Sequence, residues 1–249
     1  AVTPANGSIT PTGTTWVAHG GSQAYAITPN ANYRITDVTV DTLSQGPTNS
    51  YTFVNVTNGG HTINAAFALD TFTLSVNSAY GTPTPAGVTT NNWNTPINAL
   101  VNSPVPNGAS TQYVCTGWVG TGSAPVSGIT NSTSFNITAD STLSWSWKTQ
   151  YLLNVVAGAN GGITTSNGWY DAGTPGVVVT AAPSNGYNFT GWSGDIVSTN
   201  SSLNLTMGQS YSLTANFAIN QYTITATAGA NGDIAPSGAV VVAWNNNQA

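Results

Sequence analysis

The chain has 249 residues and a formal net charge of −5, and only 4% of its residues are charged, against about 25% in an average soluble domain. Its two cations, Arg34 and Lys148, are too few to neutralise the phosphates of a nucleic acid. Long soluble helices and coiled coils need Glu, Lys and Arg on their wet faces, and Glu is absent. No apolar run approaches the roughly 20 residues of a membrane span, so we expect neither a nucleic-acid partner nor a membrane span.

The polar residues are mainly Ser, Thr, Asn, Gln and Gly, so the surface is expected to carry few ions. Neighbouring subunits or glycans can cover such a surface without desolvating charges. Together with a single cysteine, Cys115, the composition favours an extracellular or cell-surface location without disulfides. Seven Asn-x-Ser/Thr sequons are candidate N-glycosylation sites, at Asn6, Asn55, Asn131, Asn136, Asn188, Asn200 and Asn204.

Three sequence blocks recur in one order and define a repeated module. An opening block at 151–163 returns at 222–234, in diverged form at 72–81, and without its leading strand at 2–9. A middle block at 187–192 matches 113–118 and, more loosely, 33–38, and a closing block occurs at 62–67, 142–147 and 212–217. The blocks place module 1 at residues 1–69, module 2 at 70–148, module 3 at 149–218 and a partial module 4 at 219–249.

The predicted elements are strands and tight turns in every module. Apolar and polar residues alternate over 71–76, 142–147 and 222–227, which is the pattern of half-buried strands. Asn-Gly pairs predict tight turns with positive φ, at 6–7, 107–108, 160–161, 167–168, 185–186 and 231–232. No stretch combines helical spacing with caps. The sequence therefore predicts an all-β fold of tandem, small β-sandwich-like modules without substantial helix.

Few residues offer catalytic or metal-binding chemistry. His19 and His61 each stand beside a Gly pair, which favours a turn, and no ligand cluster accompanies them. Asp37 and Asp41 share one face of a predicted strand and are a candidate Ca²⁺ or glycosidase pair. The alternative is that they bond their own turns, as is expected of three further residues beside Gly, namely Asp171, Asp195 and Asp233. We expect no enzyme, no catalytic residue, no bound metal and no cofactor.

Cys115 and Lys148 each allow two interpretations. Cys115 aligns with Ile35 and Phe189, so it is either a small buried hydrophobe or a reactive thiol that forms an intersubunit disulfide. Lys148 follows the closing block of module 2. It is either a linker residue whose stem lies along apolar surface or one partner of an isopeptide crosslink with an Asn.

The eight tryptophans divide into two groups. Four recur at block positions and are expected to pack in cores, namely Trp118, Trp192, Trp145 and Trp147. The other four lie in turn-rich segments, namely Trp16, Trp93, Trp169 and Trp244. Exposed aromatic side chains make good contacts with partners, so the second group is expected to meet glycans or another subunit.

The blocks of module 3 identify a family resemblance. The motifs Gly-Trp-Tyr-Asp at 168–171, Tyr-Asn-Phe-Thr-Gly-Trp-Ser-Gly-Asp at 187–195 and Leu-Thr-Ala-Asn-Phe at 213–217 resemble the divergent bacterial and archaeal surface repeats related to the internalin B-repeat. The resemblance covers nearly the whole chain and is most complete over 150–218. It implies an extracellular structural or adhesive role, with no catalysis and no cofactor.

The two ends of the chain are expected to complement each other. Module 1 lacks an opening strand, and the partial module 4 supplies one with the residues Gln221, Tyr222, Thr223, Ile224, Thr225, Ala226 and Thr227. Strand addition to an open sheet edge would join copies head to tail, and such non-closing contacts generate fibres. The sequence thus predicts a self-assembling filament, pilus-like fibre or sheath. The alternative is an adhesin or stalk segment that binds glycans or other envelope proteins.

Overall fold

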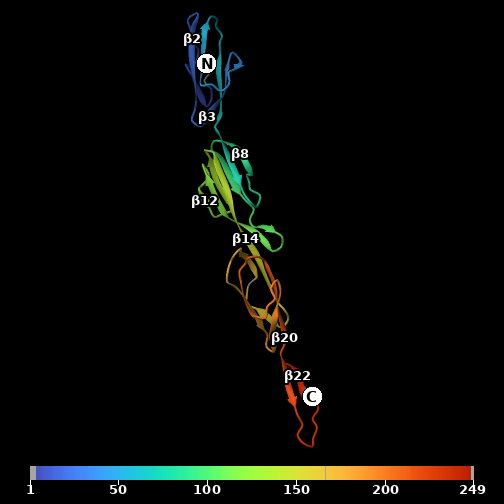
Figure 1. Ribbon diagram of the computed structural model, residues 1–249. Coiled ribbons are helices and arrows are strands. Elements are labelled where there is room, and N and C mark those ends of the chain that lie inside the picture. Colours follow the sequence, from blue (N-terminus) through green and yellow to red (C-terminus); the bar gives the residue numbers. More distant parts are fainter. Residues whose placement is uncertain (1–3, 166, 248–249) are drawn as a thin grey trace. The chain divides into compact units, whose positions relative to one another are not determined.

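The structure, a computed structural model, describes residues 4–165 and 167–247. Within these ranges the chain forms strands joined by turns, and no residue is helical (Figure 1). The predicted all-β class is therefore confirmed. The chain divides into two compact units, Ala1–Val101 with Gly117–Ser146, and Asn102–Thr116 with Trp147–Ala249.

The first unit begins with two small sheets that enclose one core. One sheet has the order β1-β2-β5 and the other β4-β3-β6. Their bounds are β1 (Gly7–Thr10), β2 (Gly21–Pro29), β3 (Tyr33–Val40), β4 (Leu43–Ser44), β5 (Ser50–Val56) and β6 (Ile63–Leu69). Ile9 and Ile27 from one sheet and Val38 and Ile63 from the other lie in the same buried cluster, as expected of a sandwich-like module.

The rest of the first unit is built on four strand pairings. β7 (Thr71–Asn77) pairs with β8 (Gly87–Asn92) and, in parallel, with residues 141–144 of β14 (Ser141–Ala157). β9 (Thr95–Leu100) pairs with β13 (Ser132–Ile137), and β11 (Thr111–Thr121) pairs with β12 (Ser127–Gly128). β11 and β14 are long strands that contribute residues to both units.

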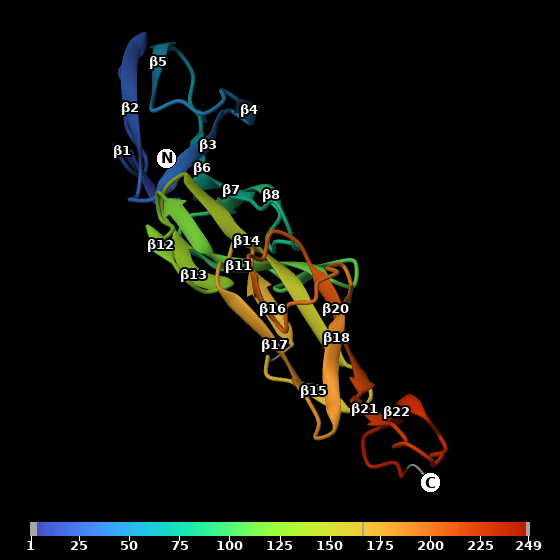
Figure 2. The same cartoon turned by 60° about the horizontal axis from the view of Figure 1, so that its bottom comes forward.

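In the second unit, β14, β20 and β18 run side by side (Figure 2). The later part of β14 pairs with β16 (Gly168–Asp171) on one edge and with β20 (Tyr211–Ile219) on the other, and β20 pairs with β18 (Tyr187–Gly194). A separate sheet has the order β15-β17-β19, with β15 (Gly161–Ile163), β17 (Val177–Pro183) and β19 (Ser202–Leu205). Two hairpins complete the unit, β10 (Val105–Asn107) with the start of β11, and β21 (Gln221–Ala226) with β22 (Gly238–Ala243).

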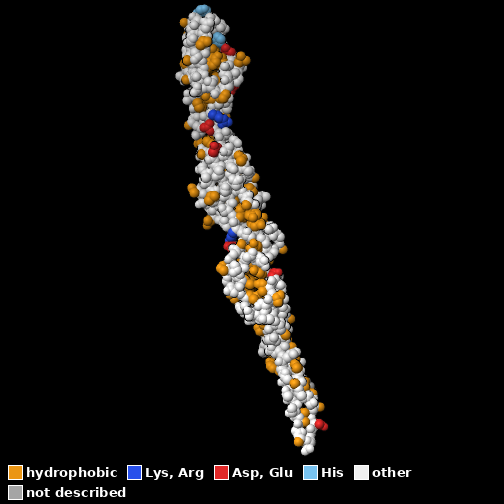
Figure 3. Space-filling view, in the orientation of Figure 1, with side chains coloured by type: hydrophobic (Ala, Val, Ile, Leu, Met, Phe, Trp, Pro, Cys, Tyr) orange, Lys and Arg blue, Asp and Glu red, His pale blue; other side chains and the backbone are white. Residues whose placement is uncertain are grey.

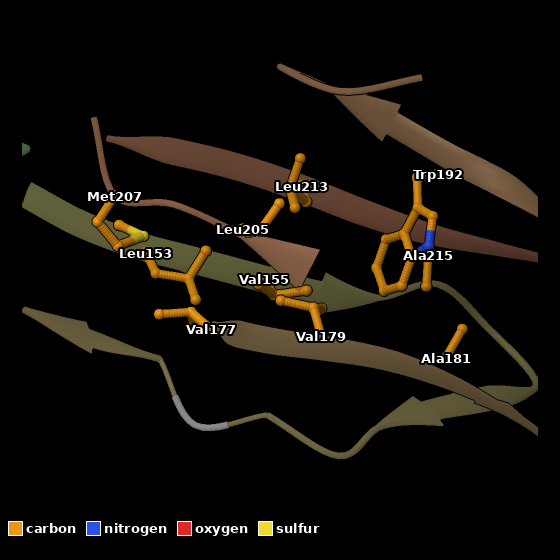
Figure 4. Packing of buried hydrophobic residues seen from close by; sticks show 10 residues of the cluster. All are labelled: Leu153, Val155, Val177, Val179, Ala181, Trp192, Leu205, Met207, Leu213 and Ala215. Carbon is orange, nitrogen blue, oxygen red and sulfur yellow. The ribbon is translucent and has the colours of Figure 1, made fainter. Parts of the chain in front are cut away.

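The core of module 3 draws on both of its sheets (Figure 4). β14 supplies Leu153 and Val155, which pack in one cluster with Val179 of β17, Trp192 of β18 and Leu213 of β20. The indole N–H of Trp192 donates to the Asn200 carbonyl at 2.9 Å, which satisfies its polar atom. Trp118, Trp145 and Trp192 are buried and Trp147 is half-buried, so the prediction that these four recurring tryptophans pack in cores is confirmed for the first three.

Three of the six predicted Asn-Gly turns share one backbone conformation at the Asn, whereas at 107–108 and 185–186 only the Gly has a positive φ and at 167–168 the Gly does not. Asn6, Asn160 and Asn231 all have φ near +68°, the left-handed conformation that Asn tolerates. The glycines that follow the first two, Gly7 and Gly161, leave room for an aromatic ring, because a Cβ on either would lie 2.3 Å from Phe67 or Phe217. The predicted last strand is observed as β21, which ends at Ala226; Thr227 lies one residue beyond it.

Candidate functional site

The opening strand of a complete module is part of its core. In module 2, Leu74 and Val76 of β7 lie opposite Ser141 and Leu143 of β14 in a parallel pair. In module 3, Leu153 and Val155 of β14 lie opposite Tyr211 and Leu213 of β20, in the same register relative to the closing block. Leu74 and Leu153 are both 0% exposed. Each closing strand therefore receives an opening strand of its own module along one edge.

Module 1 differs because the corresponding edge of β6 is open. β6 is the last strand of the sheet β4-β3-β6, and within residues 4–165 and 167–247 its other edge pairs with no strand. Val38 of β3, opposite Ala65, directs its N–H to Gly46 and its C=O to Gln45, away from β6. Antiparallel pairs alternate in this way, so the main-chain groups of Ala65, and likewise of Ile63, face the open edge.

A groove of about 860 Å³ lies beside the start of this edge. Its walls come from residues 13–17, from β2 and β5, and from residues 56–63. The apolar and aromatic lining residues are Trp16, Val17, Tyr25, Phe53, Val56 and Ile63. Phe53 lies edge-on to Tyr25, with ring centroids 5.9 Å apart, and 5.3 Å from the ring of His61. Trp16 is 94% exposed, which confirms the prediction that it is available for contacts.

His61 and Asp41 are hydrogen-bonded to each other at the groove. His61 Nδ1 lies 2.6 Å from Asp41 Oδ2, and the N–H of Thr62 donates to Asp41 Oδ1 at 2.7 Å. The hydrogen bond from His61, followed by that from Thr62, lowers the pKa of Asp41 below its ordinary value. Asp195 binds the N–H of Ser212 in module 3 in the same way. An aspartate therefore accepts a hydrogen bond from the first N–H of the closing block in both modules 1 and 3.

The other predicted polar sites also serve turns and pairings. Asp37 accepts hydrogen bonds from Ser44 Oγ at 2.7 Å and from the Gly46 N–H at 3.1 Å. It therefore acts in a different turn from Asp41, and these two carboxylates form no joint site. Across the described parts of the chain, no group of three or more His, Cys, Asp or Glu side chains is placed to hold a metal ion.

Lys148 and Asp171 are brought together by the pairing of β14 with β16. Lys148 Nζ lies 2.9 Å from the Asp171 carboxylate, which also accepts a hydrogen bond from Gln150 at 2.8 Å. These bonds, the one from Lys148 first, lower the pKa of Asp171. The prediction that the Asp171 carboxylate bonds its own turn is therefore wrong, because its partners Lys148 and Gln150 lie on β14. Cys115 is half-buried, and its N–H donates to Ser103 Oγ at 2.9 Å.

β21 has the sequence pattern of an opening strand, but unlike the opening strands of modules 2 and 3 it is not buried. By the repeat alignment, Tyr222, Ile224 and Ala226 correspond to residues 151, 153 and 155 of module 3. Within the described residues β21 pairs only with β22. Tyr222 is 54% exposed and Ile224 is 50% exposed. The predicted intersubunit strand is therefore an exposed strand with one open edge.

Surface chemistry is otherwise uniform. Figure 3 shows few charged side chains among mostly polar and backbone surface, with apolar side chains scattered between them. No helix among the residues that the structure describes is long and apolar enough to cross a membrane.

The comparison with protein families gives the class of this fold. The family model for the divergent InlB B-repeat domain matches residues 151–221, which is module 3 without its first two residues and with three residues beyond it. This confirms the resemblance drawn from the motifs over these residues, and the match does not extend to modules 1 and 2. Residues 151–221 are thus similar to the divergent InlB B-repeat domain, and this similarity indicates a cell-surface type of repeat in that part of the chain. No curated protein and no solved structure matches the chain.

Proposed function

We propose that this protein is an extracellular structural subunit that polymerises by donating β21 of one copy to the open edge of β6 in the next. The single observation that carries the proposal is the parallel pairing of opening with closing strands in modules 2 and 3. Those pairs show which kind of strand fits this edge. Repeated head-to-tail donation does not close on itself and produces a filament, a pilus-like fibre or a sheath.

The register of the donated strand follows from module 3. Leu153 opposes Tyr211 and Val155 opposes Leu213, and the closing blocks align His61 with the first of these two β20 residues and Ile63 with the second. Ile224 is therefore expected opposite His61, and Ala226 opposite Ile63. In module 3 the strand also continues past the core, since the Gly158 N–H donates to the Ala215 carbonyl at 2.8 Å.

The side chains of donor and acceptor are complementary in size. Ala226 is smaller than Val155, the residue at its position in module 3. Tyr25 of module 1 is equivalent to Val179 of module 3, and its aromatic side chain is larger than the valine side chain. Val155 and Val179 share one buried cluster, so a small residue on the donor leaves room for the large one on the acceptor. β21 carries no charge, so the donor strand brings no ion of its own into the groove.

A disulfide trap tests both the partner and the register. Thr225 is predicted opposite Thr62, as Asn154 is opposite Ser212. Paired residues at that spacing allow a disulfide. With Cys115 replaced by Ser, the pair Thr62→Cys and Thr225→Cys is expected to give a ladder of disulfide-linked multimers on non-reducing gels. The pair Asn154→Cys and Ser212→Cys is the positive control and is expected to crosslink within one chain.

A shifted pair separates specific docking from random collision. Thr62→Cys with Thr223→Cys moves the donor cysteine by two residues on the same strand face and is expected to give few multimers. Monomers alone from the matched pair would overturn the proposal. Oxidation within single chains would also overturn it, because the acceptor edge would then be filled by its own chain.

A second candidate function, glycan binding by an adhesin or stalk, is favoured by Trp16. Its ring is almost fully exposed beside a groove that also contains Tyr25 and Phe53, and aromatic faces with polar neighbours are suited to amphipathic ligands. This function predicts a solution monomer that binds an oligosaccharide on a glycan array. Trp16→Ala should then abolish that binding while the thermal unfolding of the protein stays the same.

A further inference from the structure

One sequon recurs at the same place in all three modules. The sequences Asn55-Val-Thr, Asn136-Ile-Thr and Asn204-Leu-Thr end the corresponding strands β5, β13 and β19. Residues two apart in a strand share a face, so Asn136 and Asn204 are expected on the same side as the threonines that follow β13 and β19. Asn55 departs from this alternation, because its φ is +50°. All three asparagines and all three threonines are exposed, while Ile137 and Leu205 between them are buried.

These strands are edges of their sheets. β5 and β19 end the orders β1-β2-β5 and β15-β17-β19, and β13 is one strand of a two-stranded sheet. Unprotected edges invite pairing with other chains, and many proteins protect them with charged residues, especially Lys. This chain has one lysine and one arginine, so another form of protection is needed at three edges that recur along it.

The remaining sequons follow the same distribution. Asn6 and Asn131 immediately precede β1 and β13, Asn188 lies in β18, and Asn200 lies two residues before β19. Each of these strands is an edge strand of its sheet. The inner strands β2, β3, β17 and β20 contain no sequon, and neither do β6 and β21.

We infer that Asn55, Asn136 and Asn204 carry N-linked oligosaccharides that cover the edges β5, β13 and β19. In the transfer, the side-chain Nδ2 forms a bond to C1 of an oligosaccharide, and the bond from C1 to the phosphate of its lipid carrier breaks. The amide loses one proton, and the carrier leaves as the lipid phosphate or diphosphate. The inference is independent of the proposed polymerisation, although it leaves the edges of β6 and β21 uncovered.

The test is a peptide map by mass spectrometry of the intact protein recovered from the cells that make it. Peptides containing Asn55, Asn136 and Asn204 are expected to carry an oligosaccharide mass, and the peptide with Asn49, which stands in no sequon, is expected to be unmodified. Unmodified asparagine at all three recurrent positions would overturn the inference. So would modification confined to the other four sequons.

Matched substitutions of the sequon threonines give a second readout. The triple variant Thr57→Val, Thr138→Val and Thr206→Val keeps every asparagine but removes each sequon, and it should lose three glycan masses. The matching triple Thr→Ser variant preserves the sequons and should retain them. Equal masses for the two variants, after correction for the substitutions, would contradict the inference. If the valine variant is not recovered, the peptide map of the wild-type protein decides by itself.

Discussion

Ile224 occupies the position that Leu153 has in module 3, but half of the Ile224 side chain is exposed whereas Leu153 is fully buried. Equivalent strands of the repeat are therefore found once inside a core and once on an open edge. The difference lies in the neighbour, since β14 pairs with β20, whereas among the described residues β21 pairs with β22 alone. An isoleucine on an open edge is available to a partner strand.

Substitution at these two positions should separate stability from assembly. Leu153→Ala removes buried methyl groups and is expected to cost about 2–5 kcal/mol of unfolding free energy, measured by chemical denaturation. Ile224→Asp should change that free energy by about 1 kcal/mol or less, because the side chain is half exposed. It should nevertheless abolish fibres in negative-stain micrographs, because it would place a charge in the acceptor groove. Fibres as abundant as those of the wild-type protein would refute the role of β21.

Replacement of Gly161 by alanine, which adds one methyl group, is expected to destabilise the fold. A Cβ at this position would lie 2.3 Å from the ring of Phe217, so Gly161→Ala should destabilise the protein by about 1–3 kcal/mol through overpacking. The neighbouring Gly162 has no atom closer than 4.0 Å to such a Cβ, and Gly162→Ala is the matched control. Thermal unfolding by calorimetry measures both, and equal melting temperatures would show that the Phe217 ring moves aside without cost.

Local features of the fold could be predicted from the sequence, but features that depend on distant neighbours could not. Alternation over 71–76 and the turn at Asn160 are encoded by adjacent residues, and both occur as predicted. The groove depends on Tyr25 and Phe53, which come from different strands. Their contact follows from strand pairing, which local sequence does not fix.

The polar sites show the same limit. Asp41 was expected in a turn, and it is found there, but its partner His61 is 20 residues away in the chain. Lys148 and Asp171 are 23 residues apart and meet only because β14 pairs with β16. The repeat alignment contains a usable signal: Asp41 and Asp195 each stand three residues after the end of their middle blocks, at Val38 and Trp192, which indicates a shared capping role.

The Asp41–His61 pair should make module 1 sensitive to acid. Hydrogen bonds from His61 and Thr62 lower the pKa of Asp41, so the folded state binds a proton at this carboxylate less readily than the unfolded state does. The resulting stabilisation is present above the ordinary pKa of Asp and is lost as the pH falls through the lowered value. The carboxyl ¹³C shift of Asp41 should titrate below the ordinary pKa of 3.8, and His61→Gln should raise its midpoint. An unchanged midpoint in the variant would show that His61 does not cause the shift.

Lys148 and Asp171 are expected to contribute little to stability despite their short contact. Their side chains are 40% and 47% exposed, and ion pairs at such exposure are worth roughly 0–1 kcal/mol. Lys148→Met keeps the apolar stem and removes the charge, so the unfolding free energy should fall by less than about 1 kcal/mol. Because salt screens exposed charges, the difference between variant and wild type should shrink further in 1 M NaCl. A loss above about 2 kcal/mol that persists in high salt would show instead that Lys148 stabilises the junction through packing of its stem or through its effect on Gln150, which shares the Asp171 carboxylate.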